Sequence, residues 1–376
     1  MKFSLRWFYL SVLLLPLSLS ADVTYTGSAF PSGGSTYVGY NAAGDLTITA
    51  TGSPTVLTTT GYSYIGYLNG GIGTATVTGS GAQWLTPNNT MFVGTFSGSS
   101  GLLSILNGGY VQSSYATLGY DANTSGEIDV TGAGSQWTMG GSTFATLIGN
   151  NGSGILKLQS GGVATIASSI YVTSNTGSTG AITVDGVGSQ LNANGGLYFS
   201  VSANTTATMG VTNGGKVVST ETGLYGTDTV TVDGSGSTFN TGNLVIGNSG
   251  NSALNISNGG VVNSGNTTLG YTKGAVSGTA TLAGTNSQWN VAGTMTVGGS
   301  SSTGSVTVSD GALLSVVNTG INVATGTANN VLTLGASPQS SNPGETASTG
   351  TLTIGTGGAA GQLSLDQVFG WYSTST

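Results

Sequence analysis

One unit recurs along nearly the whole chain, and this self-similarity restricts the fold more than any other feature. The first form of the unit, TATVTGSGAQW at 74–84, returns at 127–137, 181–191, 229–239 and 279–289. A second form, LLSILNGGYV at 102–111, has related copies between those of the first, at 155–164, 209–218, 253–262 and, more loosely, 305–314. Periods of roughly 20 to 50 residues are typical of solenoids, in which each unit packs against its neighbours.

A short motif closes each unit, as in Tyr64-Ile65-Gly66. Further copies end at Gly39, Gly94, Gly119, Gly149, Gly247, Gly270, Gly298 and Gly355, and degenerate versions lie at 171–172, 198–199, 224–225 and 322–323. Neighbouring copies are 22 to 31 residues apart, so the basic unit has about 26 residues and about a dozen units are present.

Within each unit, apolar and polar residues alternate with the period of a β-strand. The positions of Ala75 and Val77 hold only small or branched apolar residues in every copy of the first form, and Thr76 between them is usually Thr. We therefore expect an all-β, single-stranded parallel β-helix, in which each unit is one coil of about three short strands with glycine at its corners. An antiparallel array of hairpins joined by Asn-Gly turns is the alternative.

A large apolar side chain recurs at the end of the first form of the unit. This position holds Trp84, Trp137, Leu191, Phe239 and Trp289. Large side chains at one aligned position favour a hydrophobic stack inside the coils or at their corner, and a surface stripe for stacking carbohydrate is the alternative interpretation.

The composition excludes most familiar active sites. The 376 residues include no Cys and no His, so disulfides, Ser-His-Asp triads and thiolate or imidazole metal sites are impossible. Residues 1–20 read as a signal peptide with cleavage before Ala21, because Lys2 and Arg6 precede a short apolar run. The remaining 21–376 are expected to form a repeat domain over 21–361 and a tail or incomplete last coil over 362–376, with no membrane span.

After the signal peptide, the only cations are Lys157, Lys216 and Lys273, against 12 acidic residues. Removing two of the five basic residues changes the formal net charge from −7 to −9. A chain with so few cations cannot neutralise many phosphates, so nucleic acid is not an expected partner.

Few residues suggest chemistry. Glu127 and Asp129 lie two apart on one strand and could act as a carboxylate pair in glycoside hydrolysis, but as replacements in an outward row they are better interpreted as surface carboxylates. Asp185 and Asp233 recur at one turn position and are interpreted as turn-capping side chains. We expect no catalytic residue, no metal site and no cofactor.

A row of outward threonines could form a hydroxyl array that orders water against ice. The row would contain Thr76, Thr183, Thr231, Thr281 and Thr307. Because Thr is a common solvent-facing strand residue, this function ranks behind a structural role.

The phrases VTGxGSxW, LxVG and LxIxNGGxV resemble the passenger-associated β-strand repeats of bacterial type V autotransporters over residues 36–361. This resemblance implies a right-handed parallel β-helix that is exported and displayed at, or released from, an outer membrane. The family's roles include adhesion, aggregation and structural stalks, with enzymatic domains in some members. About fifteen residues follow the last clear repeat, too few for a translocator barrel, so the chain is expected to be a truncated or split passenger or to be attached by other means.

We therefore expect a non-enzymatic, exported structural or adhesive protein at the bacterial cell surface or outside the cell. Its expected partners are cell-surface glycans or other copies of itself. The alternatives are a polysaccharide-processing β-helix enzyme and an ice- or surface-binding solenoid.

Overall fold

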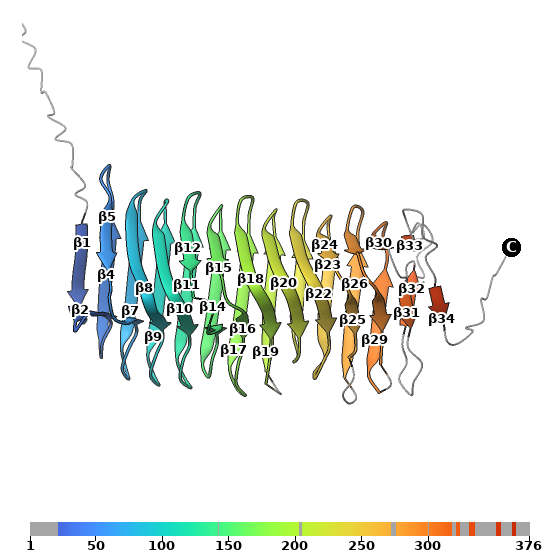
Figure 1. The fold of residues 1–376 in the computed structure, drawn as a ribbon, viewed down its shortest axis with the longest axis horizontal. Coiled ribbons are helices and arrows are strands. Elements are labelled where there is room, and N and C mark those ends of the chain that lie inside the picture. Colours follow the sequence, from blue (N-terminus) through green and yellow to red (C-terminus); the bar gives the residue numbers. More distant parts are fainter. Residues whose placement is uncertain are drawn as a thin grey trace, which may run out of the picture.

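The computed structural model describes residues 22–141, 143–202, 205–271, 276–299, 301–317, 321–323, 331–334, 351–354 and 363–365. Every regular element among them is a β-strand, and the strands form a stack of coils that ascends along one axis (Figure 1). The β-solenoid has about 11 turns of ~26 residues, as the repeat predicts. The hairpin alternative is wrong for these coils, because strands of successive coils pair in parallel. The predicted signal peptide lies outside the described residues.

One wall of the solenoid is a sheet with one strand from each coil. Its strands, in spatial order, are β1 (Asp22–Gly27), β4 (Ala43–Thr49), β7 (Ile72–Thr78), β9 (Ser100–Leu106), β11 (Ser125–Thr131), β14 (Ser153–Gln159), β17 (Thr179–Asp185), β19 (Thr206–Thr212), β21 (Thr229–Asp233), β23 (Ser252–Ser257), β26 (Ser277–Ala283), β29 (Thr303–Val308) and β32 (Val331–Leu334). Sequence order equals spatial order, which makes each unit one coil.

The remaining strands form two further columns. In several coils the two columns are joined in one long strand, as in β8 (Ala82–Val93), β10 (Tyr110–Leu118), β18 (Gln190–Phe199), β20 (Lys216–Leu224) and β22 (Thr238–Ile246). Elsewhere the first column holds β5 (Thr55–Thr58), β12 (Gln136–Met139), β15 (Val163–Ile166), β24 (Val261–Ser264), β27 (Gln288–Val291), β30 (Leu313–Val316) and β33 (Thr351–Ile354). The second holds β3 (Ser35–Val38), β6 (Ser63–Ile65), β13 (Thr146–Ile148), β16 (Ile170–Val172), β25 (Thr267–Leu269), β28 (Met295–Val297), β31 (Ile321–Val323) and β34 (Leu363–Leu365).

The first coil carries the only antiparallel pairs among the described strands, and the repeat did not predict them. β1 runs antiparallel to β4, and β2 (Ala29–Ser32) runs antiparallel to β3. β1 therefore covers the edge that β4 would otherwise present. Among the described residues no helix is long and apolar enough to cross a membrane.

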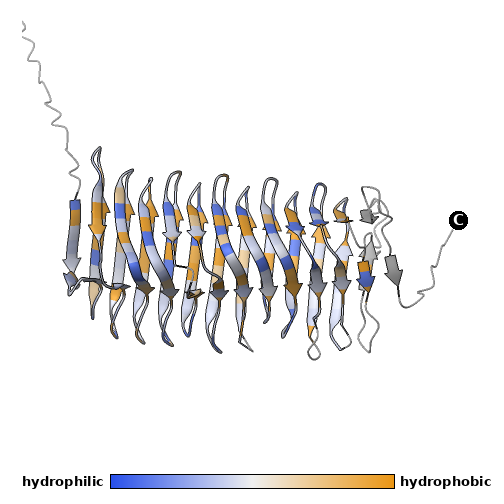
Figure 2. Cartoon of the chain, in the orientation of Figure 1, coloured by the Kyte–Doolittle hydropathy of each residue, from blue (hydrophilic) through white to orange (hydrophobic). Residues whose placement is uncertain are grey.

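The predicted alternation is confirmed. Ala75 and Val77 are fully buried, whereas Thr76 between them faces outward on β7. Bands of both hydropathies along the strands in Figure 2 follow this alternation. The inward residues between Ala29 and Ile321 form one continuous core along the axis.

The core explains why the unit has two forms. In the first strand column, Trp84, Trp137, Phe239 and Trp289 belong to the first form, and the coils between them place Val111, Ala164, Val217 and Val262 in register with these large side chains. Strands of neighbouring coils are only about 4.8 Å apart, so a small side chain in the adjacent coil leaves room for a bulky one. At the two ends of this series, Trp84 and Trp289 are instead in register with Leu57 and Leu314. Two coils, rather than one, are therefore the repeating unit of packing.

Glycine at the corner allows two backbones to approach closely. Gly66 has φ +72°, and a Cβ there would lie 2.0 Å from Ser100 O of the next coil. The facing Gly101 is equally restricted, since its Cβ would lie 2.1 Å from Ile65 O. The glycine pair explains much of the chain's glycine content.

This corner changes in the middle of the molecule. Thr173 and Ser200 take the left-handed conformation there, and Asp228 follows in the next coil with 1% of its surface exposed. The Ser200 hydroxyl is 3.0 Å from that of Thr173 and donates to Asp228 Oδ1 at 2.5 Å. The backbone amides of Ala207 and Gly226 also donate to the Asp228 carboxylate. Burial raises the pKa of Asp228, while these donors oppose the shift.

Candidate functional site

The strongest sequence candidates for catalysis lie on the outer face of β11. Lys157 Nζ forms an ion pair with Glu127 Oε1 at 2.5 Å, and the Thr131 hydroxyl donates to Asp129 Oδ1 at 2.6 Å. The Lys157 and Glu127 side chains are 37% and 30% exposed. Each carboxylate therefore has its own partner in the outer surface, as the surface interpretation expects.

Asp185 and Asp233 each join one coil to the next. Asp185 Oδ1 accepts hydrogen bonds from the side chains of Thr212 and Asn213, both at 2.6 Å. Asp233 Oδ1 accepts the equivalent pair from Ser257 and Asn258, also at 2.6 Å. Both carboxylates therefore cap the turn of the following coil rather than share a ligand. Within the described ranges, no group of three or more acidic side chains could hold a metal ion.

The outward threonine row is interrupted by other residue types. In register, Thr76 is followed by Ser104, Asp129, Lys157, Thr183, Gly210, Thr231, Asn255, Thr281 and Thr307. The second form of the unit supplies Ser104, Lys157, Gly210 and Asn255, and Asp129 interrupts the row within a copy of the first form. The regular hydroxyl array that ice binding would need is therefore broken in most alternate coils.

The large residues at the end of the first form are fully buried, so the interior stack is confirmed for them and the carbohydrate stripe is wrong. The indoles of Trp84 and Trp289 donate to the hydroxyls of Thr59 and Ser264 inside the core, both at 3.0 Å. Their polar atoms are thereby satisfied without reaching the surface.

Half-buried aromatic residues on the outer surface belong instead to the closing motif. Its first residue points outward, and in register this outward row reads Tyr37, Tyr64, Phe92, Thr117, Leu147, Tyr171, Tyr198, Gly223, Val245, Thr268, Thr296 and Asn322. The row is aromatic or apolar over much of its first part and polar after Val245. The repeat pattern identifies this motif only as the end of each unit. The recurrence of Tyr and Phe at its first position is the sequence feature that could have indicated the aromatic row.

Nine rings gather where this row begins. We call them the N-terminal aromatic cluster: Phe30, Tyr37, Tyr40, Tyr62, Tyr64, Tyr67, Phe92, Phe96 and Tyr120. The rings of Tyr37 and Tyr64 are 5.1 Å apart and 13° from parallel, and those of Tyr64 and Phe92 are 5.4 Å apart and 11° from parallel. The rings of the row therefore cover one another's faces.

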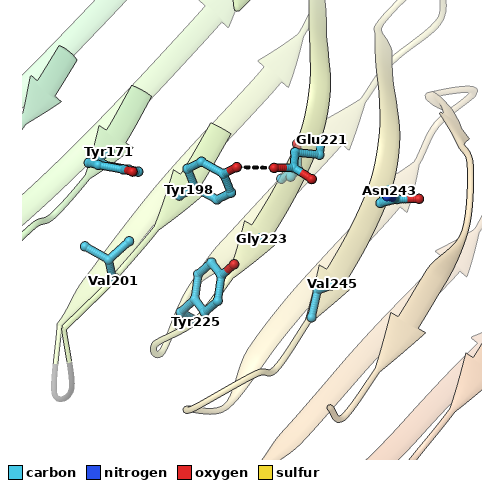
Figure 3. A pocket seen from close by; sticks show the side chains of 9 residues that line it. Tyr171, Tyr198, Val201, Glu221, Gly223, Tyr225, Asn243 and Val245 are labelled. Carbon is cyan, nitrogen blue, oxygen red and sulfur yellow. Dashed lines mark hydrogen bonds between the residues drawn. The ribbon is translucent and has the colours of Figure 1, made fainter. Parts of the chain in front are cut away.

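A second group lies farther along the row, around an open pocket of about 430 Å³ (Figure 3). We call its three rings, Tyr171, Tyr198 and Tyr225, the tyrosine platform. Neighbouring centroids are 5.4 and 6.2 Å apart, with interplanar angles of 44° and 52°, so these rings do not stack face to face. Glu221 and Asn243 line the same pocket, and the Tyr198 hydroxyl donates to Glu221 Oε1.

Tyr64, Tyr198 and Tyr225 keep their hydroxyl protons at neutral pH. Burial, with smaller contributions from Tyr67, Tyr37 and Tyr62, raises the pKa of Tyr64 to about 12. Burial and the nearby Glu221 carboxylate raise the pKa of Tyr198 and Tyr225. All three side chains can therefore act as hydrogen-bond donors.

Fold and surface together define the class: a parallel β-solenoid with exposed aromatic groups along one face. No known protein family and no curated protein matches the chain. Among solved structures, it is similar to a TibC-catalysed, hyperglycosylated fragment of TibA, with 18% sequence identity and a TM-score of 0.32. That match covers 72% of this chain and 97% of the fragment.

Proposed function

We propose that the protein is an exported, non-enzymatic rod that serves as a structural or adhesive module at the bacterial cell surface, in the manner of an autotransporter passenger. The observation that carries this proposal is the placement of half-buried, outward-facing aromatic rings at successive coils of one face. A rigid solenoid holds these groups at fixed spacing, so weak contacts add along its length and produce avidity.

The nature of the surface favours uncharged partners. Aromatic side chains offer large contact areas at low entropic cost, and the tyrosine hydroxyls add hydrogen bonds at the edges. Of the three lysines that follow the predicted signal peptide, Lys157 forms an ion pair with Glu127. The partners we propose are therefore neutral cell-surface glycans or other copies of the same chain, not nucleic acid.

Two further observations disfavour the alternative functions, catalysis and ice binding. Glu127 and Asp129, the best candidates for a catalytic pair, are held by Lys157 and Thr131 on an outer strand. The outward threonine row that would support ice binding is interrupted by Asp129, Lys157 and Gly210.

Export is tested in cells that express the full chain. We expect the N-terminus of the processed protein to be Ala21, and we expect added protease to reach the protein in intact cells. A chain that retains Met1 and resists protease until the cells are lysed would contradict export.

Adhesion is tested with inert beads that carry the purified processed chain. We expect the beads to clump or to be retained on glycan-coated surfaces, and we expect serine at Phe30, Tyr62 and Phe96 to abolish the clumping. These rings are exposed and lie at the rim of the N-terminal aromatic cluster. The matched control replaces Val56 and Ile72, which are equally exposed apolar residues outside that cluster.

No adhesion by the unmodified chain to glycans or to itself would overturn the proposal, and equal clumping by both variants would overturn the role of the N-terminal aromatic cluster in it. Circular dichroism of each variant ensures that a loss of adhesion is not a loss of fold.

A further inference from the structure

The tyrosine platform has a floor of glycine. A Cβ at Gly196 would lie 2.4 Å from Tyr198 Cζ, and a Cβ at Gly223 would lie 2.4 Å from Tyr225 Cε2. The rings of Tyr198 and Tyr225 therefore each lie directly over the glycine two residues earlier in the chain. Residues two apart on a strand share a face, so a side chain at either glycine would force the ring away from the sheet.

The pocket forms because the repeat is modified at this point. Gly223 stands in the outward row between Tyr198 and Val245, where the row would otherwise have a side chain. The ring of Tyr225 comes from the following corner and occupies this place. Three rings from three successive coils thus line the pocket in sequence along the axis (Figure 3).

Polar groups lie beside the rings rather than among them. Glu221 and Asn243 are in register on neighbouring coils, and both line the pocket. Glu221 Oε1 accepts the Tyr198 hydroxyl, which fixes the carboxylate and the ring relative to each other. An acid and an amide at the edge of an aromatic surface offer both acceptors and donors to the hydroxyl groups of a ligand.

The lining selects among ligand classes. It includes one carboxylate and no cation, which disfavours phosphates, sulfated sugars and uronic acids. A compact ammonium ion would be best held by rings that form walls around it, whereas these rings follow one another along the axis. A row of aromatic faces with polar groups beside it fits an extended ligand that has apolar faces and hydroxyl edges.

From this geometry we infer that the tyrosine platform, with Glu221 and Asn243, is a binding subsite for a neutral oligosaccharide whose sugar rings lie along the solenoid axis. This inference rests on the proposed adhesive function and names its site and ligand class. The N-terminal aromatic cluster is not such a subsite, because its row of rings stacks face to face.

The test is calorimetric titration of the purified processed chain with cellohexaose, maltohexaose, mannohexaose and chitohexaose. We expect at least one of them to bind, and we expect Tyr198→Ala and Tyr225→Ala each to weaken that binding by about tenfold, the change that a loss of 1.4 kcal/mol produces. Gly223→Val should weaken binding similarly, because it displaces the Tyr225 ring without removing any ring or polar group. Tyr198→Phe, which keeps the ring, should retain more affinity than Tyr198→Ala.

Tyr64→Ala is the matched control, since it removes a tyrosine of the same row from the stacked cluster. Unchanged saccharide affinity in this variant supports the platform, whereas a loss equal to that of Tyr198→Ala would overturn it. Preferential binding of tetramethylammonium, or of an oligogalacturonate, would overturn the assignment of ligand class.

Failure of all four hexasaccharides to bind would overturn the inference alone if beads coated with the chain still adhere or clump. Loss of both behaviours would overturn the proposed function as well. A melting temperature close to that of the unmodified chain shows that a variant is folded, and only such variants are compared.

Discussion

The N-terminal aromatic cluster and the tyrosine platform contain the same kind of residue in the same outward row, yet they present different surfaces. Tyr64 follows Tyr62 by two residues, and its ring stacks on its neighbours in the row. Tyr198 follows Gly196 by two residues, and its ring lies down over the glycine. The residue two positions earlier on the strand thus decides whether a ring stacks on neighbouring rings or leaves its face available to a ligand.

The backbone corners differ between the same two regions. Coils near the N-terminal aromatic cluster use paired glycines, and those near the tyrosine platform use Thr173, Ser200 and Asp228. The second solution replaces close backbone contact with buried hydrogen bonds. One solenoid thus contains a regular part and a modified part, and the candidate saccharide subsite lies in the modified part.

The largest effect is expected from the glycine corner. A Cβ at Gly126 would lie 2.0 Å from Val93 O, so Gly126→Ala should destabilise the protein by about 3 kcal/mol through overpacking. Ala207 belongs to the same column, and Ala207→Gly should cost only about 1 kcal/mol or less. Urea unfolding of the two variants measures the difference, and equal losses would mean that the two corners do not differ.

Asp228→Ala comes next. It removes the acceptor of the Ser200 hydroxyl and of the Ala207 and Gly226 amides, and it should cost about 2 kcal/mol. Asp121→Ala, at an outer corner of the regular part, provides the control and should cost less.

The pH dependence sharpens the Asp228 prediction. Burial raises its pKa in the folded state, so the folded protein holds the proton to higher pH than the unfolded chain does. The stability that this residue contributes is therefore greatest below its unfolded pKa of about 3.9 and falls as the pH rises through the folded value. Asp228→Asn should lack this slope, and a slope that persists in the variant would assign it to another group.

A smaller difference in stability is expected between substitutions in the N-terminal aromatic cluster and in the tyrosine platform. Tyr64 contacts four rings, those of Tyr37, Tyr62, Tyr67 and Phe92, so Tyr64→Leu should cost about 1 kcal/mol in lost aromatic contacts. Tyr198→Leu should cost less, because that ring has only tilted neighbours. Thermal unfolding compares the two, and a greater loss for Tyr198→Leu would reverse the roles we assign to the groups.

The smallest change in stability is expected in the sheet that contains β11 and β14. Lys157→Met breaks the ion pair with Glu127. Both side chains of this pair are partly exposed and screened by water, so the substitution should change stability by about 0.5 kcal/mol or less. Unfolding in low and high salt measures this change. A salt-dependent loss larger than that of Tyr64→Leu would mean that the charged face matters more than the aromatic face.

The sequence predicted the coil well because one coil repeats the next. The alternation of Ala75, Thr76 and Val77 was sufficient to assign inward and outward faces, and parallel stacking then followed. The handedness implied by the family resemblance stays a prediction. The antiparallel β1 could not be predicted from the repeat, because Asp22–Gly27 lies outside it.

The candidate subsite was less accessible to sequence reasoning. The orientation of the Tyr198 ring depends on Gly196 beneath it, and that of Tyr225 depends on Gly223, whereas the repeat pattern assigns glycine to corners. Asp228 also escaped notice, because the corner between Leu224 and Thr229 departs from the glycine motif that aligned the other coils. Departures from the repeat, rather than the repeat itself, thus mark the residues with special roles.

The pairing of Trp84 and Trp137 with Val111 between them has a consequence for how such a rod can change length. Removing one coil would bring two indoles into adjacent layers of the core, whereas removing two coils would leave large and small layers in their original order. Tandem duplication or loss of about 50 residues is therefore the step that this chain can accommodate, and lineages that lengthen or shorten the rod should differ by even numbers of coils.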